Sequence, residues 1–335
     1  MTPEIIAHRG ASYLAPENTL SAFRKAMEIG ADGVEMDVQQ TSDKKLVIHH
    51  DYIIDLHTDI SGKIYDMTEG ELKELDFGSW KDIAYKDEKI ATLEEALALC
   101  KELDVARVQL EMKAPLLYSD AFVEQVVEQV RAAGLGEKLV LTSFNHDHLK
   151  LAKQQMPELQ VGALLFGAVE TLALPKGTWE TLGLQNGLDE DEDEDDFPQL
   201  PVPTVENMDE ENCRELTRWV NDKYSMLQAA FPNESLSGIL SKLNDLCTRL
   251  NRQRDPAQYI QTLDFPVEWV SCEYHTAYKK VSMVQKLHDL GVKTAFWTVD
   301  TEAALKDLWP LQPDAIVTNR PDRVREWSGE LETSE

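Results

Sequence analysis

The stretch Gly33-Val34-Glu35-Met36-Asp37-Val38 decides the fold, because it reads as a buried strand that carries two carboxylates. Side chains alternate between the two faces of a strand, so Glu35 and Asp37 point the same way. Two further stretches, Ile5-Ile6-Ala7-His8-Arg9-Gly10 and Val108-Gln109-Leu110-Glu111-Met112-Lys113, also open apolar and close on charged residues. Carboxylates, a His, an Arg and a Lys at the ends of successive strands predict a site for a hard cation and a phosphate.

Strand and helix patterns alternate outward from these stretches. Strands are expected at about 4–8, 33–38, 107–112, 139–142, 160–165, 267–272, 294–298 and 315–317, and helices at about 68–75, 93–103, 119–133, 147–155, 277–290 and 302–308. A further helix is expected to begin after Asn18 as its N-cap, and Thr92 with Glu95 predicts a capping box. Eight strands alternating with helices predict an α/β fold, a (β/α)8 TIM barrel, with a doubly wound open sheet as the alternative. Active sites of such barrels lie at the C-terminal ends of the strands.

Two segments interrupt the alternation. A small excursion covers about 51–89, after the second strand, and a longer insertion covers about 167–264 between the fifth and sixth strands. The insertion contains the acidic run Asp189–Asp196 and two apolar helical stripes that predict a helical hairpin at about 206–252. The barrel is therefore expected at 1–166 and 265–327, with a tail at 328–335. The hairpin would decorate the barrel, cover the site, or offer a surface for a protein partner or self-association.

Composition narrows the possible partners and the compartment. The 335 residues carry a formal net charge of −28, which argues against nucleic acid and an anionic membrane surface as partners. The four cysteines form no CxxC pair, which is typical of a reduced intracellular protein. No secretory signal is evident, and no stretch reaches the roughly 18 apolar residues of a membrane span. The sequence predicts a cytoplasmic protein without stable membrane insertion.

Several motifs occur in a fixed order along the chain. They are Ala7-His8-Arg9-Gly10, Pro16-Glu17-Asn18-Thr19, the stretch from Gly30 to Val38, His50-Asp51, Leu110-Glu111-Met112-Lys113, Phe296-Trp297-Thr298-Val299-Asp300 and Thr318-Asn319-Arg320-Pro321-Asp322. Together they resemble the glycerophosphodiester phosphodiesterase family over about 1–165 and 265–325. One departure is the stretch Ile54-Asp55-Leu56-His57-Thr58, which lacks an Arg that the family usually carries.

The resemblance implies a role for each matching residue. It implies acid–base catalysis by His8 and His50, metal ligation by Glu35, Asp37 and Glu111, and phosphate or substrate binding by Arg9, Lys113, Glu17 and Trp297. An all-oxygen ligand set favours one divalent cation, Mg²⁺ or Ca²⁺. His49 and His50 are adjacent and face opposite ways on a strand, and the His50-Asp51 match favours His50. Glu17 has a second possible role as a charge at a helix N-terminus.

The resemblance also implies an activity, which is metal-dependent hydrolysis of glycerophosphodiesters to sn-glycerol 3-phosphate and an alcohol. The small-molecule diester would be the main partner. The attack on phosphorus would come either from the glycerol 2-hydroxyl, through a cyclic phosphate, or directly from water. The alternatives are a lysophospholipase D or another lipid-directed phosphodiesterase, and a binding or scaffold protein that acts through its insertion.

Overall fold

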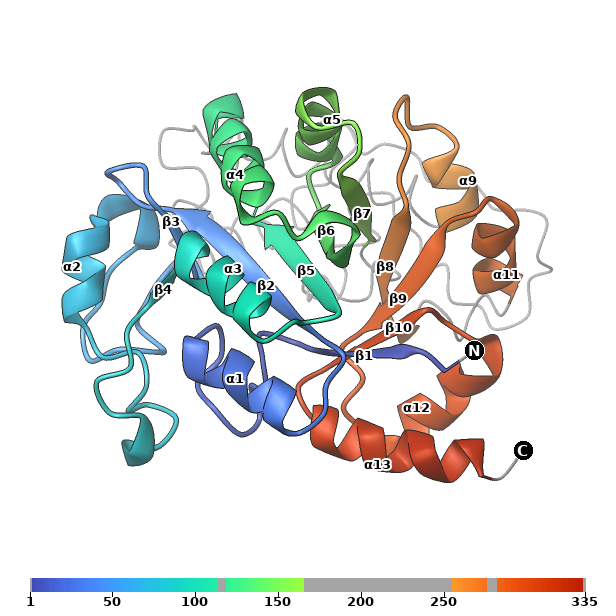
Figure 1. The fold of residues 1–335 in the computed structure, drawn as a ribbon, viewed down its shortest axis with the longest axis horizontal. Coiled ribbons are helices and arrows are strands. Elements are labelled where there is room, and N and C mark those ends of the chain that lie inside the picture. The colour runs from blue at the N-terminus through green and yellow to red at the C-terminus, as the bar shows by residue number, and fades with distance from the viewer. Residues whose placement is uncertain (1, 114–118, 166–254, 276–281, 334–335) are drawn as a thin grey trace, which may run out of the picture. The chain divides into compact units, whose positions relative to one another are not determined.

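The computed structural model describes residues 2–113, 119–165, 255–275 and 282–333, and all of these except Asp255 belong to one compact unit (Figure 1). The strands are β1 (Glu4–Ala7), β2 (Gly33–Gln40), β3 (Leu46–Ile48), β4 (Ala91–Thr92), β5 (Arg107–Met112), β6 (Leu139–Ser143), β7 (Gln160–Leu165), β8 (Trp269–Glu273), β9 (Lys293–Trp297) and β10 (Ala315–Thr318). The helices are α1 (Leu20–Glu28), α2 (Glu69–Glu74), α3 (Leu93–Glu102), α4 (Asp120–Ala133), α5 (His146–Gln155), α9 (Pro256–Ile260), α11 (Ser282–Asp289), α12 (Glu302–Leu308) and α13 (Pro321–Glu332). Among these elements, no helix is long and apolar enough to cross a membrane.

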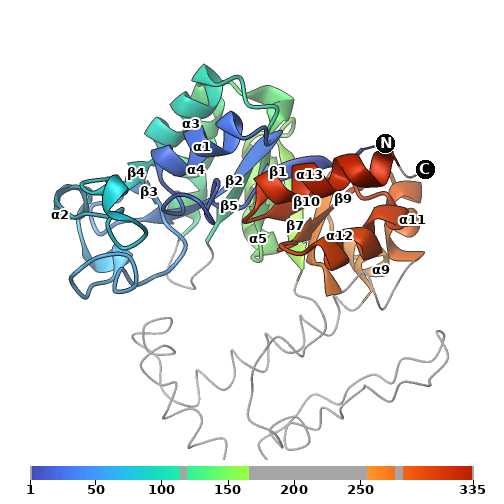
Figure 2. The ribbon, with the colours of Figure 1, turned by 90° about the horizontal axis from the view of Figure 1, so that it is seen from below.

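Eight parallel strands close into a barrel. Their order is β1-β10-β9-β8-β7-β6-β5-β2, and β2 pairs back with β1. The helices lie on the outside of the barrel (Figure 2). Two short strands, β3 and β4, extend the sheet antiparallel from β2 and lead into the predicted excursion. The closed ring confirms the TIM-barrel prediction and excludes the doubly wound alternative, whose sheet stays open.

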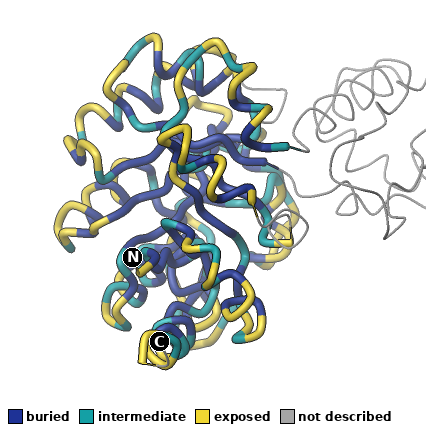
Figure 3. Tube along the Cα trace, turned by 90° about the vertical axis from the view of Figure 1, so that its right-hand side faces the viewer, coloured by how far each residue is buried: buried dark blue, intermediate teal, exposed yellow. Residues whose placement is uncertain are grey.

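The core lies between the barrel and its helices. Buried residues lie toward the centre of the barrel unit, while exposed residues lie along its outer coils (Figure 3). Helix α4 shows how the pattern works, since Phe122, Val126 and Val130 recur at helical spacing and all belong to the main hydrophobic cluster. The helix ends at Gly134, which adopts the left-handed conformation with φ 64° that glycine accepts without strain.

Replacing Phe122 by alanine is expected to destabilise the fold by about 3–5 kcal/mol, because the side chain is fully buried and its loss leaves a cavity. Urea unfolding followed by circular dichroism measures the change. Ile83→Ala is the control, since Ile83 is 74% exposed and its truncation leaves no cavity. Equal midpoints for the two variants would contradict the placement of Phe122 in the core.

The N-cap of α1 differs from the prediction. Thr19 caps the helix, with its Oγ1 accepting a hydrogen bond from Ala22 N at 3.2 Å. Asn18 instead adopts φ 57° and donates from Nδ2 to Asp37 Oδ2 at 2.8 Å. The Asn18 prediction was wrong because a buried carboxylate competes for that amide. The capping box of Thr92 and Glu95 on α3 is confirmed.

Three segment boundaries also differ. Strand β2 continues to Gln40 beyond the expected end at Val38, because residues 38–40 pair with β3. Helix α13 continues to Glu332, so most of the expected tail at 328–335 is helical, and Val324 on its inner face is fully buried. The barrel unit resumes at Pro256, before the expected residue 265, because Ala257 and Ile260 of α9 join its core. The predicted acidic run and helical hairpin lie outside the described residues.

An ion pair lies at the N-terminal ends of the strands. Arg107, at the start of β5, donates from Nε and Nη2 to the two carboxylate oxygens of Glu4, both at 2.8 Å. The guanidinium also lies 5.2 Å from the ring of Trp269 at the start of β8. This cluster joins three strand starts at the end of the barrel opposite to the charged residues predicted to form the site.

Candidate active site

The C-terminal ends of the strands surround one cavity. Its lining includes most of the predicted site residues, namely His8, Arg9, Glu35, His50, Glu111, Lys113 and Trp297. Asp37 lies beside the cavity, where its Oδ1 is 3.4 Å from Lys113 Nζ and its Oδ2 is 3.6 Å from Arg9 Nε. Glu17 accepts a hydrogen bond from Arg9 Nη1 at 2.8 Å. The fold therefore brings all nine predicted residues into one neighbourhood.

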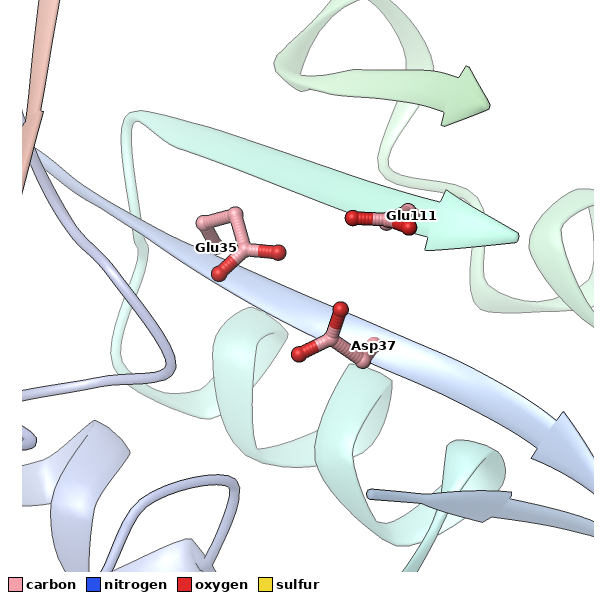
Figure 4. A group of neighbouring side chains, drawn as sticks. All are labelled: Glu35, Asp37 and Glu111. Atoms are coloured by element: carbon pink, nitrogen blue, oxygen red, sulfur yellow. The ribbon is translucent and has the colours of Figure 1, made fainter. Parts of the chain in front are cut away.

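The three carboxylates form a compact acidic cluster. Strand register places Asp37 of β2 directly beside Glu111 of β5, and Glu35 lies one pleat earlier on the same face of β2. One oxygen from each group lies within 4.8 Å of the other two (Figure 4). Such an all-oxygen set could hold a divalent cation.

Repulsion among the three carboxylates favours the binding of a cation by the cluster. Burial, followed by the charges of Asp37 and Glu111, raises the pKa of Glu35 well above its usual range. Burial alone would also raise the pKa of Asp37, but Lys113, His50 and Arg9 together hold it well below its ordinary value. Asp37 Oδ1 is buried and accepts no hydrogen bond. A bound cation would satisfy this oxygen and allow all three groups to ionise.

The positively charged side chains of Lys113 and Arg9 lie beside the acidic cluster. Lys113 Nζ lies 2.9 Å from Glu111 Oε1, and the charges of Glu111 and Asp37 raise its pKa against the opposing effect of burial. Arg9 Nε is buried without a hydrogen bond. An Arg fork and a Lys point charge next to a cation-binding cluster form a setting that suits a phosphate group.

Arg9 and Gly10 both have positive backbone φ angles. Arg9 has φ 58°, and its N–H donates to Glu35 Oε2 at 2.9 Å. Gly10 follows with φ 78°, and a Cβ at this position would lie 2.7 Å from backbone and side-chain atoms of Ala22. This tight approach of the loop to α1 explains the glycine, and it fixes both the Arg9 backbone and the Glu35 carboxylate.

His8 is held as a neutral imidazole. Its Nδ1 lies 2.7 Å from Asn319 Oδ1, and Asn319 Nδ2 donates to Asp300 Oδ2 at 2.6 Å. Because Asn319 Oδ1 is an acceptor, His8 Nδ1 carries the hydrogen and Nε2 presents a lone pair. Burial, and then the charge of Arg9, lowers the pKa of His8 to about 4. Its Nε2 lies 3.9 Å from Glu35 Oε2, beside the acidic cluster.

His50 is paired with a carboxylate. Its Nδ1 lies 2.8 Å from Asp51 Oδ1, and this hydrogen bond lowers the pKa of Asp51 to about 2. His49 faces away from the cavity, with its ring 5.7 Å from that of Phe77. The structure thus brings His50, and not its neighbour, into the cavity, as the sequence predicts.

The stretch that departs from the family pattern lies behind Arg9. His57 Nε2 is 3.9 Å from Glu17 Oε1, the oxygen that also accepts the bond from Arg9, and neither His57 nor Glu17 lines the cavity. The ring of His57 also lies 4.6 Å from that of Trp80. Glu17 is therefore placed between Arg9 and His57, which fits support of Arg9 better than direct contact with a substrate.

Four supporting residues were missed by sequence reasoning. Asn319 and Asp300 orient His8, and Asn18 orients Asp37. Gln39 Nε2 donates to the backbone oxygens of three successive residues from His49 to Asp51, at 2.8, 3.1 and 2.8 Å. The first three stand in recognised motifs that could have suggested them, whereas nothing in the sequence marks Gln39.

Solved structures confirm the class of fold. A phosphodiesterase from Oleispira antarctica, solved in complex with the product sn-glycerol 3-phosphate, aligns with a TM-score of 0.61 and 22% identity, covering 97% of this chain and 96% of that one. A glycerophosphodiester phosphodiesterase from Agrobacterium tumefaciens aligns with a TM-score of 0.60 and 18% identity, covering 96% and 97% of the two chains. These likenesses show the fold alone, a closed barrel of parallel strands surrounded by helices.

Sequence comparison identifies the family. The model of the glycerophosphoryl diester phosphodiesterase family matches residues 8–196, more than half of the chain, and the protein belongs to this family. A glycerophosphodiester phosphodiesterase from Caldanaerobacter subterraneus is 38% identical over 160 residues, which are 48% of this chain and 65% of that relative. The rat glycerophosphodiester phosphodiesterase 1 is 36% identical over 162 residues, 42% of this chain and 48% of the relative.

Proposed function

We propose that the protein hydrolyses glycerophosphodiesters to sn-glycerol 3-phosphate and an alcohol, with one divalent cation, Mg²⁺ or Ca²⁺, at Glu35, Asp37 and Glu111. The observation that carries the proposal is the single cavity in which two differently paired imidazoles face an acidic cluster flanked by Arg9 and Lys113. Family membership supports the same reaction. When bound, the cation would supply charge stabilisation for the phosphoryl oxygens.

His8 is proposed as the general base. Its Nδ1 hydrogen is fixed by a neutral amide oxygen, so its Nε2 lone pair is free to take the proton of the attacking oxygen. Asp300, which holds Asn319, keeps that amide from turning. The attacking oxygen belongs either to the glycerol 2-hydroxyl or to water, and the same base serves both.

His50 is proposed as the general acid. The Asp51 carboxylate accepts the Nδ1 hydrogen and orients the ring, so that the Nε2–H of a protonated His50 would face the departing alkoxide. Gln39 holds the backbone of this segment through three carbonyl oxygens, so the ring is carried on a fixed loop.

Arg9, Lys113 and Trp297 are proposed to bind the substrate. The Arg9 fork and the Lys113 ammonium would contact the phosphate oxygens, with Glu17 orienting Arg9. Trp297 closes another side of the cavity, where its ring stands nearly perpendicular to that of Phe144 at 6.0 Å. Its buried Nε1 has no hydrogen-bond partner, which suits an indole wall that meets the glycerol of a bound diester.

Release of sn-glycerol 3-phosphate from glycerophosphocholine and glycerophosphoethanolamine tests the proposal. Release is expected to require Mg²⁺ or Ca²⁺ and to fall to background when a chelator is present, because three mutually repelling carboxylates cannot orient the diester alone. A coupled glycerol 3-phosphate assay measures the rate. No release from any diester with either cation would overturn the proposed function.

A further inference from the structure

Large hydrophobic side chains are exposed on one part of the described surface. Seven of the eight that are at least 38% exposed there come from residues 13–14 and 53–83, and the eighth is Leu290. We call the seven the apolar rim: Tyr13, Leu14, Ile53, Leu56, Ile60, Trp80 and Ile83. Single exposed apolar side chains are ordinary, but a group of them on one surface marks an interaction site.

The apolar rim is held together by specific contacts. Lys81 Nζ donates to the backbone oxygen of Ser12 at 2.7 Å, and Tyr85 Oη donates to that of Leu14 at 3.1 Å. These bonds fasten the 80–85 turn to the 12–14 loop. Trp80 in turn contacts the ring of His57, with centroids 4.6 Å apart, so the 53–60 loop adjoins the same surface.

This surface begins at the mouth of the active site. Ser12 Oγ donates to Asn319 Oδ1 at 2.9 Å, the same oxygen that fixes His8. Tyr13 N donates to the backbone oxygen of Asn319 at 3.1 Å. Ile53 follows the His50-Asp51 pair by two residues, and His50 lines the cavity. A molecule that covers the apolar rim would therefore lie against the catalytic cavity.

The polar groups within the apolar rim indicate what covers it. Lys81 Nζ lies 5.9 Å from the ring centre of Tyr13 and 5.7 Å from that of Trp80, and the Arg320 guanidinium lies 4.2 Å from the Tyr13 ring. Tyr, Trp, Lys and Arg side chains prefer the boundary between lipid headgroups and water. Their cations match headgroup phosphates, while the chain's net charge of −28 opposes an anionic surface.

We propose that the apolar rim docks the protein on a zwitterionic phospholipid surface, with the catalytic mouth facing the headgroups. The contact is peripheral, because the rim comes from short loops whose side chains can enter only the headgroup region. Docking goes beyond the hydrolysis of a soluble diester and does not depend on it. It would deliver the site to phosphodiesters presented by a lipid assembly.

Sedimentation with phosphatidylcholine vesicles tests the proposal. The full chain is compared with a double variant, Leu56→Ser with Ile83→Ser, and with Leu290→Ser as the matched control. The two rim side chains are 69% and 74% exposed, so their replacement leaves the core intact, and Leu290 is 43% exposed. The double variant is expected to lower the vesicle partition coefficient at least about tenfold, while the control leaves it unchanged.

Several outcomes would overturn docking. These are absence of wild-type binding, equal binding of the double variant, or an equal loss in Leu290→Ser. Binding of monomeric lysophosphatidylcholine without vesicle binding would replace the surface with an acyl-chain site. Hydrolysis of soluble glycerophosphocholine is expected to be the same in the double variant and the wild type. Vesicle binding without any hydrolysis would count against the proposed function and would leave docking supported.

Discussion

Replacing His8 or His50 by alanine is expected to lower kcat for glycerophosphodiester hydrolysis by about two orders of magnitude or more. Each variant removes one of the two groups proposed to transfer a proton: His8, whose Nδ1 bonds Asn319, or His50, whose Nδ1 bonds Asp51. Because both proton transfers belong to the chemical step, kcat should fall while KM changes little. Steady-state assays with saturating cation measure both constants.

A matched control separates catalysis from folding in this experiment. His288→Ala also removes an imidazole that is bonded to a carboxylate, Asp314, but at the strand starts, away from the cavity. Its kcat should stay near that of the wild type, and circular dichroism should show the same fold for all three variants. Near-wild-type turnover in the His8 or His50 variant would remove that residue from the acid–base pair.

Replacing Glu35 or Glu111 by glutamine is expected to weaken Mg²⁺ or Ca²⁺ binding at least about tenfold, or ~1.4 kcal/mol. The amide keeps the size of the side chain but removes one of three charges that a cation would neutralise. Calorimetric titration of metal-free protein measures the affinity. Glu273→Gln is the control, since this glutamate ends the barrel strand β8 but does not belong to the acidic cluster.

Without a bound cation, the Glu35→Gln variant is expected to be more stable than the wild type. In the wild type, burial and the neighbouring charges disfavour ionised Glu35, as the raised pKa shows. Glu35→Gln should therefore raise the Tm measured with chelator and reduce the further rise on adding cation. An unchanged titration, or a Tm that falls in chelator, would contradict the ligand role.

Alternating strand and helix patterns predicted the barrel well, because most strand residues are buried and helices with an apolar face follow the strands. The bounds of β5, β7 and α12 agree with the sequence expectation to the residue. Prediction failed where a polar residue has a tertiary partner. Asn18 looked like a helix cap but bonds Asp37, and Gln39, which no motif marks, holds the backbone from His49 to Asp51.

The convergence of the candidate site residues could be predicted because they lie at the ends of the strands. Glu35, Asp37 and Glu111 stand on strands whose register the apolar pattern specifies, so their convergence could be predicted. The motif around Asn319 could have suggested this residue but not its contact with His8, since the two residues lie 311 positions apart in the sequence and meet only when β10 pairs with β1. The His50-Asp51 motif favoured His50 over His49, and His50 is the one that lines the cavity.

The Glu4–Arg107 pair has a consequence for how such a protein can change. It joins strand starts at the end of the barrel opposite to the proposed catalytic residues, so stability and chemistry would depend on separate sets of residues. Substitutions that reinforce this base, such as added ion pairs around Trp269, should raise heat tolerance without altering turnover. The loops at the C-terminal ends of the strands can then change in sequence to accept new substrates. This makes the scaffold a favourable starting point for laboratory evolution.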